Sequence, residues 1–161
     1  MGKRSLISIL TGWLLVFTVL TQASTPDAPA VSRLTDGPII VPNMDARMGS
    51  NIQGPSLIRV PDWVENPLGK YYLYFADHRG DYIRLAYADQ LTGPWQIHSP
   101  GTLTLEQSFF PTTCPPCSVP PGSTSPAYAH IASPDVHVRE DLQQIVMYVH
   151  GRDPLQQVTR Y

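Results

Sequence analysis

Short hydrophobic stretches follow one another along the chain from about residue 55, and none of them shows the 3.6-residue period of a helix. Val, Ile, Leu, Tyr and Phe gather in Ser56–Val60, Lys70–Ala76 and Tyr82–Ala88, and Gly, Pro, Asp and Asn separate these stretches. This composition favours strands. The polar loop Asp77–Asp81 predicts a hairpin turn, and Trp95–Ile97 predicts the start of a fourth strand. The pattern therefore predicts an all-β protein.

The strand pattern then begins a second time. Three features recur in the same order, at distances of 79, 74 and 76 residues: Pro55–Val60 and Pro134–Arg139, Tyr74 and Tyr148, Arg84 and Arg160. A repeated meander of about four strands is the unit of a β-propeller. We expect blade one at about 38–100, a Pro-rich loop at 100–130 and the start of blade two at 131–161.

One and a half blades leave apolar faces without neighbours, because a repeat unit buries its faces only against the next unit. We therefore expect the chain to be the N-terminal part of a longer protein. Alone, it is expected to be neither a stable domain nor active.

The first residues predict an export signal. Lys3 and Arg4 precede an apolar run from Leu6 to Leu20, and the small residue Ala23 offers a cleavage site. This order is typical of a secretory signal peptide at 1–23, and the run is short for a membrane-spanning helix. We expect a secreted or periplasmic protein with no stable membrane span after cleavage.

The composition of the chain excludes two classes of protein, those that bind nucleic acid through a basic surface and those that are disordered. The chain has 161 residues, a formal net charge of −2 and 15% charged residues. A nearly neutral chain lacks the basic surface that binds nucleic acid, so no nucleic-acid partner is expected. An aromatic content of 9% with low net charge is also unlike that of a disordered chain.

Cys114 and Cys117 form a C-P-P-C sequence in a Pro-rich stretch. A redox pair of this spacing needs its first cysteine at the start of a helix, which the prolines disfavour. A metal site needs two further ligands at a comparable spacing, and no second C-x-x-C exists. A structural disulfide in an exported loop is the favoured interpretation.

Several segments resemble a known family: "NIQGPSLI" at 51–58, "GKYYLYFA" at 69–76, "IRLAYAD" at 83–89 and "LTGPW" at 91–95. They are similar to the opening blade of five-bladed propeller glycosidases, namely glycoside hydrolase family 43 and the related families 32 and 68. Ala132–Val136 resembles the start of the second blade of those enzymes. The resemblance covers about 38–161, and the matching segments are typical of the strands of the fold and do not contain the catalytic residues. It implies a five-bladed propeller that hydrolyses O-glycosidic bonds in oligo- or polysaccharides, with no cofactor expected.

The resemblance also implies an acid directly before the first-blade proline, but Gly54 precedes Pro55 here. The other acids of the family fall in later blades, beyond Tyr161. Hydrolysis needs one ionised and one protonated carboxyl group. The expected function is therefore a secreted, glycoside hydrolase-like protein. The alternative is a non-catalytic propeller that binds glycan or another partner, and a purely structural exported chain is a third possibility.

Asp135 and Asp45 are the candidate catalytic residues. Asp135 and His137 are two positions apart on a predicted strand, so they share one face. If that face borders the channel, the pair is expected to bind a sugar hydroxyl or share a proton. The structural alternative has Asp135 capping a turn and His137 half-buried. Asp45 would replace the missing first-blade acid, although an Asx turn is the favoured interpretation.

The candidate substrate-binding residues are His137, His130, His78, Arg79 and Asn51. His78 and His150 follow equivalent strands, with Arg79 and Arg152 close behind, and such positions can line the mouth of a propeller channel. The alternative is that these side chains hold loop carbonyls by hydrogen bonds. No metal site is expected from the histidines.

Overall fold

The computed structural model describes residues 29–114, 128–153 and 156–161. The predicted signal peptide at 1–23 lies outside the described residues. The chain divides into residues 1–32 and 33–161, and every described strand belongs to the second unit. Among the described residues, no helix is long and apolar enough to cross a membrane.

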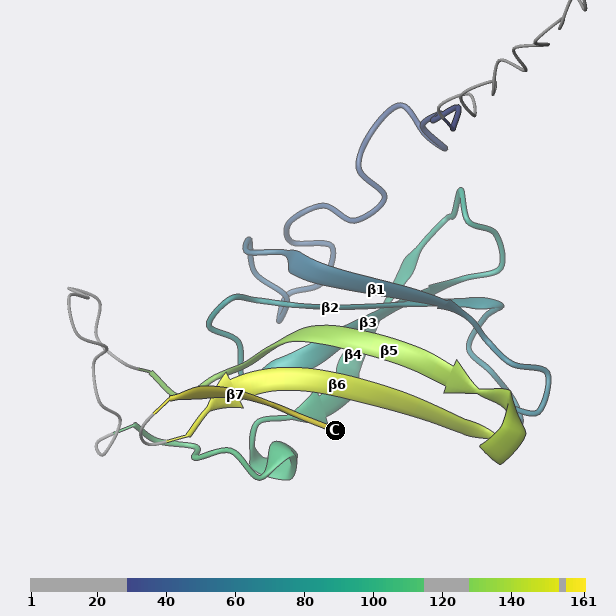
Figure 1. Ribbon diagram of the computed structural model, residues 1–161. Helices are drawn as coiled ribbons and strands as arrows, with labels where there is room; N and C mark the ends of the chain where they lie inside the picture. The colour runs from purple at the N-terminus through teal and green to yellow at the C-terminus, as the bar shows by residue number, and fades with distance from the viewer. Residues whose placement is uncertain (1–28, 115–127, 154–155) are drawn as a thin grey trace, which may run out of the picture. The chain divides into compact units, whose positions relative to one another are not determined.

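Four antiparallel strands form the first sheet in the order in which they occur along the chain (Figure 1). They are β1 (Gln53–Arg59), β2 (Tyr71–Ala76), β3 (Tyr82–Ala88) and β4 (Gln96–Thr104). Polar turns join them, including the hairpin predicted at Asp77–Asp81, where the N–H of Gly80 donates to the carbonyl of Asp77. Four predicted strands are thus confirmed.

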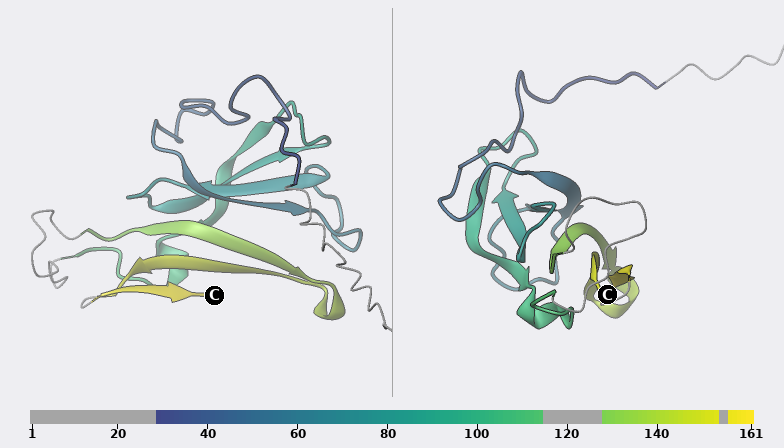
Figure 2. Two further views of the ribbon diagram at one scale, coloured as in Figure 1. Left: turned by 45° about the horizontal axis from the view of Figure 1, so that its top comes forward. Right: turned by 90° about the vertical axis from the view of Figure 1, so that its left-hand side faces the viewer.

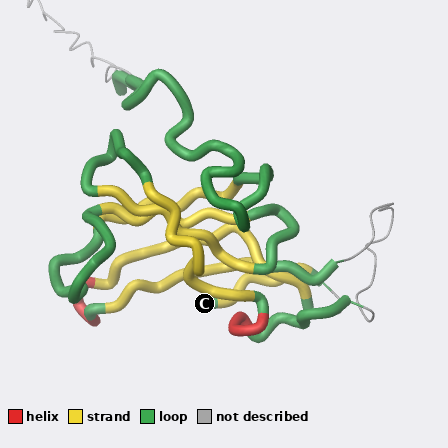
Figure 3. The backbone as a smooth tube through the Cα atoms, turned by 180° about the vertical axis from the view of Figure 1, so that it is seen from behind, coloured by secondary structure: helices red, strands yellow, loops and turns green. Residues whose placement is uncertain are grey.

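A second antiparallel sheet contains β5 (Ile131–Arg139), β6 (Gln144–Arg152) and β7 (Gln157–Arg160). The only helical segments in the described part are the single 3₁₀ turns η1 (Glu106–Ser108) and η2 (Glu140–Leu142), which Figure 3 shows from behind. The all-β class predicted from the sequence is confirmed.

β4 extends further than the sequence pattern predicted. It continues through Pro100 to Thr104, so the segment predicted as a Pro-rich loop at 100–130 begins as a strand and continues into η1. The reason is a bulge: the pairing with β3 shifts between Ile83 and Leu85, and Gly101 has a φ of 72°. A bulge accepts a proline that regular pairing excludes.

The second sheet packs on one face of the first, with β5 lying along β1 and β2 (Figure 2). Ile58, Tyr72 and Tyr74 of the first sheet meet Val136 and other buried residues of the second in one apolar core. The hydroxyl of Ser56 accepts the N–H of Val136 at 2.9 Å, which ties the first strands of the two sheets together. Burial raises the pKa of Tyr74 to about 12.

The other face of the first sheet is covered by the segment that precedes β1. Met48 is fully buried there against Leu73, Phe75 and Trp95, with Ile39 and other residues of the segment packed around them. β2 is therefore apolar on both faces, which explains its continuous hydrophobic sequence where a one-sided strand would alternate.

The pairing registers confirm the repeat that the sequence predicts. Ser56 lies opposite Tyr74 in the first sheet, and Asp135 lies opposite Tyr148 in the second. The third strands agree as well, since the two arginines take equivalent places: Arg84 opposite Phe75, and Arg160 opposite Val149. The second sheet is thus built on the same plan as the first.

Each of these arginines makes the same two contacts. Arg84 Nη2 lies 3.6 Å from Asp77 Oδ2, and its Nη1 donates to the carbonyl of Asn51 at 2.6 Å. Arg160 Nη2 lies 2.6 Å from Asp153 Oδ1, and its Nη1 donates to the carbonyl of Phe109 at 2.9 Å. The repeat therefore includes side-chain contacts as well as strand order.

Candidate functional site

The first strands of the two sheets meet at a pair of bulges. Gly54 and Ser133 both precede a proline, both have a positive φ (61° and 49°), and the pairing register shifts at each. A Cβ atom on Gly54 would lie 2.9 Å from the Cα of Ser133. The position where the family resemblance implies a catalytic acid therefore has neither the backbone conformation nor the space for a side chain.

The turn between β2 and β3 closes over this end of the sheets. The N–H of Ile131 donates to the carbonyl of Gly80 at 2.9 Å, so the turn holds the start of β5. The Asn51 side chain accepts the N–H of His78 at 3.1 Å. Asn51 and His78, two of the predicted substrate-binding residues, thus lie together, and the hydrogen bond between them is structural.

Three histidines from three segments gather here: His78, His130 and His150 form what we call the histidine cluster. The rings of His130 and His150 are 5.4 Å apart, edge to face. His130 is 1% exposed, its Nδ1 lies 3.1 Å from the carbonyl of Tyr128, and its Nε2 has no hydrogen-bond partner among the described residues. The Arg79 guanidinium lies 4.7 Å from the centre of the Tyr128 ring, and that ring contacts His130 at 4.9 Å.

The surroundings of His130 and His150 favour the neutral imidazole. Burial lowers the pKa of His130, and the nearby His78 and Arg152 lower it further against the opposing effect of the Tyr128 carbonyl. Burial also lowers the pKa of His150, with His130 and His78 adding to the effect. Both rings are therefore neutral at pH 7. Within the described ranges, no group of three His, Cys, Asp or Glu residues is placed to hold a metal ion.

A hollow of about 500 Å³ lies beside the cluster on the second sheet, and we call it the sheet-two hollow. β5, β6 and β7 each contribute to its lining, which consists of Ser133, Asp135, Tyr148, His150 and Thr159. The wall thus combines a carboxylate, an imidazole, hydroxyl groups and an aromatic ring. Such a mixture suits a ligand rich in hydroxyl groups.

Asp135 and His137 lie on one face of β5, as the two-residue spacing predicts, and His137 Nε2 is 3.0 Å from Asp135 Oδ2. The Asp135 side chain is 69% exposed and points away from the first sheet, on the side of β5 opposite the buried Val136. The ring of His137 also contacts Tyr148, at 5.8 Å. The pair borders the sheet-two hollow through Asp135.

Asp45 is not brought to Asp135. One of its carboxylate oxygens accepts the N–H of Arg47 at 2.9 Å in an Asx turn, and the other accepts the hydroxyl of Ser99. Ser99 is on β4, at the edge of the first sheet opposite β1. These hydrogen bonds lower the pKa of Asp45. The alternative weighed from the sequence, a turn-forming Asp45, matches this geometry, and a second catalytic carboxylate does not.

The predicted disulfide falls at the border of a described segment. Cys114 is disulfide-bonded. Cys117, the partner expected from the sequence, lies outside the described residues.

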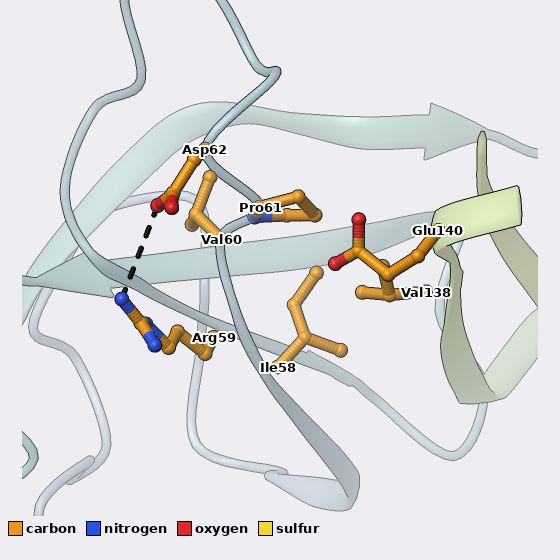
Figure 4. Close-up of a pocket in the computed structure, with 7 residues that line it drawn as sticks. All are labelled: Ile58, Arg59, Val60, Pro61, Asp62, Val138 and Glu140. Atoms are coloured by element: carbon orange, nitrogen blue, oxygen red, sulfur yellow. Dashed lines mark ion pairs between the residues drawn. The ribbon is translucent and has the colours of Figure 1, made fainter. Parts of the chain in front are cut away.

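A second pocket, of about 380 Å³, lies at the opposite end of the sheets (Figure 4). Ile58 and Val138 form its apolar wall, and Glu140 borders it while accepting the indole N–H of Trp63 at 2.7 Å. Arg59 and Asp62 form an exposed ion pair at its rim. None of the residues predicted to bind substrate lines this pocket.

Of the candidates predicted from the sequence, the structure brings His78 and His130 together where β5 begins, and it places Asp135 in the sheet-two hollow with His137 beside it on β5. Sequence reasoning missed Ser133, Tyr148 and Thr159 as lining residues, and Tyr128 as the ring between Arg79 and His130. The signal that could have found Tyr148 was the strand register: the residue opposite Asp135 is Tyr148 once the repeat is aligned.

No family model matches the chain, and no solved structure matches it. The chain is similar to an uncharacterized protein, R118, of Acanthamoeba polyphaga mimivirus, with 36% identity over 111 residues. The match covers 65% of this chain and 29% of the viral protein, so the chain spans less than a third of that relative's length.

Proposed function

We propose that this protein is a secreted carbohydrate-binding propeller related in scaffold to the family 43 glycosidases, and that an oligo- or polysaccharide binds in the sheet-two hollow. The two sheets are then two blades of a five-bladed propeller. Their shared register and their repeated arginine–aspartate contacts support this proposal.

The observation that carries the proposal is the composition of the hollow. Asp135 supplies hydrogen-bond acceptors, Ser133 and Thr159 supply hydroxyls, and His150 is a neutral imidazole that accepts and donates. Tyr148, 40% exposed, offers a ring on which a sugar face can pack. Gly54 favours binding over hydrolysis, because the first-blade acid is absent and its position is closed by Ser133.

Binding is tested with immobilised plant and algal polysaccharides, followed by calorimetry with soluble oligosaccharides of the best one. Replacing Tyr148 with Ala should weaken binding about tenfold, the effect of losing one stacking contact of about 1.4 kcal/mol. Phe109→Ser is the matched control, since Phe109 is an exposed aromatic residue outside the hollow. Absence of glycan binding, or equal effects of the two variants, would contradict the proposal.

Hydrolysis is the second candidate, and the contact between Asp135 and His137 favours it. An imidazole beside a carboxylate is a common acid–base arrangement. The check is turnover of aryl glycosides and polysaccharides by the wild type and by Asp135→Asn. Turnover that the variant abolishes would replace the binding role with an enzymatic one, and glycan binding without turnover would exclude it.

A further inference from the structure

The histidine cluster joins two segments that no strand pairing connects. His78 belongs to the β2–β3 turn, and His130 belongs to the segment Tyr128–Ile131 that enters β5. Ile131 pairs with Gly151 and is buried in the core, with Ala129 packed against it. Three further contacts join the segment to its neighbours: the Ile131 N–H to the Gly80 carbonyl, the Arg79 guanidinium on the Tyr128 ring, and the His130 ring against His150. At its centre is one buried imidazole, His130, which is 1% exposed.

The groups that face His130 are imidazoles, guanidinium groups and one neutral phenol. They come from each neighbouring segment: His78 from the β2–β3 turn, His150 and Arg152 from β6, and Tyr128 with Arg79 on its outer side. The carboxylate of the turn, Asp77, is engaged with Arg84. No carboxylate is among the groups that act on the titration of His130 or His150. A proton added here therefore meets like charge in a dry environment.

We propose that the histidine cluster is an acid-sensitive latch on the wall of the sheet-two hollow: neutral, it holds Tyr128–Ile131 against the β2–β3 turn, and protonated, it releases this segment. Release carries His130 into water, where its charge is solvated. The direction follows from linkage, because the open state binds protons more readily than the closed state and is favoured as the pH falls.

The latch reaches the ligand site through His150. This residue lines the hollow on one side and contacts His130 on the other. Opening the latch removes the support behind His150, so glycan affinity falls in acid. This consequence rests on the proposed function, whereas the latch itself does not.

Amide hydrogen exchange tests the latch on the whole chain. The Ile131 amide reports it, and the Val60 amide, which donates to the Lys70 carbonyl at 2.8 Å at the other end of the sheet, is the internal control. Between about pH 7.5 and about pH 5, the protection of Ile131, corrected for intrinsic exchange, should fall about tenfold or more for one linked proton, while that of Val60 stays constant.

Two variants test whether the histidine cluster causes the loss of Ile131 protection in acid. His130→Asn keeps a donor for the Tyr128 carbonyl and should reduce the acid effect on Ile131 to less than about threefold. His150→Phe keeps a ring against His130 and removes only the proton taken up by His150, so it should reduce the acid effect by a smaller factor. His98→Gln, on β4, should leave it unchanged. Constant Ile131 protection in the wild type, a parallel fall at Val60, or an undiminished acid effect in both cluster variants would overturn the latch.

A glycan found to bind at about pH 7.5 is then titrated at about pH 5. Weaker binding at about pH 5 in the wild type, but not in His130→Asn, supports the link between latch and hollow. If Ile131 loses protection in acid as expected but glycan affinity does not change with pH, the link between the latch and the hollow is wrong and the latch itself stands. A normal latch in a protein that binds no glycan would instead contradict the proposed function.

Discussion

Gly54 is the residue whose position allows the two bulges to pack closely against each other. Its φ of 61° and the 2.9 Å that would separate an added Cβ from Ser133 Cα make a side chain unfavourable for two separate reasons. We therefore expect a substitution of Gly54 to lower the stability of the fold. The glycine at this position is accordingly required by the backbone and by its close neighbour.

Gly54→Ala should lower the free energy of unfolding by about 1–3 kcal/mol, the cost of holding a non-glycine residue in a strained conformation. Gly37→Ala is the control, because nothing lies within 4 Å of its Cβ position, and it should change stability by less than about 0.5 kcal/mol. Urea unfolding monitored by tryptophan fluorescence gives both values. Equal stability of the two variants would show that the bulge accepts a side chain.

Asp45 gives a prediction about titration. The hydroxyl of Ser99 is the largest influence that lowers the pKa of this carboxyl group. Its contribution to stability is therefore present above the ordinary pKa of 3.8 and is lost as the pH falls through the lowered value. Ser99→Ala should raise the pKa of Asp45, as measured by carboxyl NMR titration. An unchanged pKa would mean that Arg47 alone sets it.

At the scale of elements, the strands were predictable because their residue types and spacing carry the signal. β-branched and aromatic residues located the strands of both sheets, and a two-residue spacing placed Asp135 and His137 on one face. The end of β4 was not predictable, since Pro100 and Gly101 are typical of a loop and become part of a strand only through a bulge against β3. The histidine cluster was not predictable either, because its members come from three segments whose distances depend on packing.

The two arginine–aspartate pairs should differ in strength although they are equivalent in the repeat. The Arg84 side chain is 5% exposed, whereas that of Arg160 is 38% exposed. Arg84→Met should therefore cost about 3 kcal/mol by breaking a buried pair, and Arg160→Met less than about 1 kcal/mol because water screens it. Thermal and urea unfolding of both variants would measure the difference. A larger loss for Arg160→Met would contradict this ranking.

At the scale of the whole molecule, the two sheets share a plan but differ in what covers them. The first sheet is buried on both faces, by the second sheet and by the segment that precedes β1. The second sheet is buried on one face, and its other face carries Asp135, His137 and Tyr148. Positions that form core in the first sheet thus carry polar and aromatic groups in the second: Ile58 corresponds to His137, and Tyr74 to Tyr148. This difference is why we propose the glycan site on the second sheet.

Backbone amide chemical-shift mapping with a bound oligosaccharide tests that assignment most directly. We predict saturable shifts at Ser133, Asp135, Tyr148, His150 and Thr159, with little change at the opposite end of the sheets. Shifts centred on the pocket lined by Ile58, Val138 and Glu140, or none with any glycan tested, would contradict the assignment.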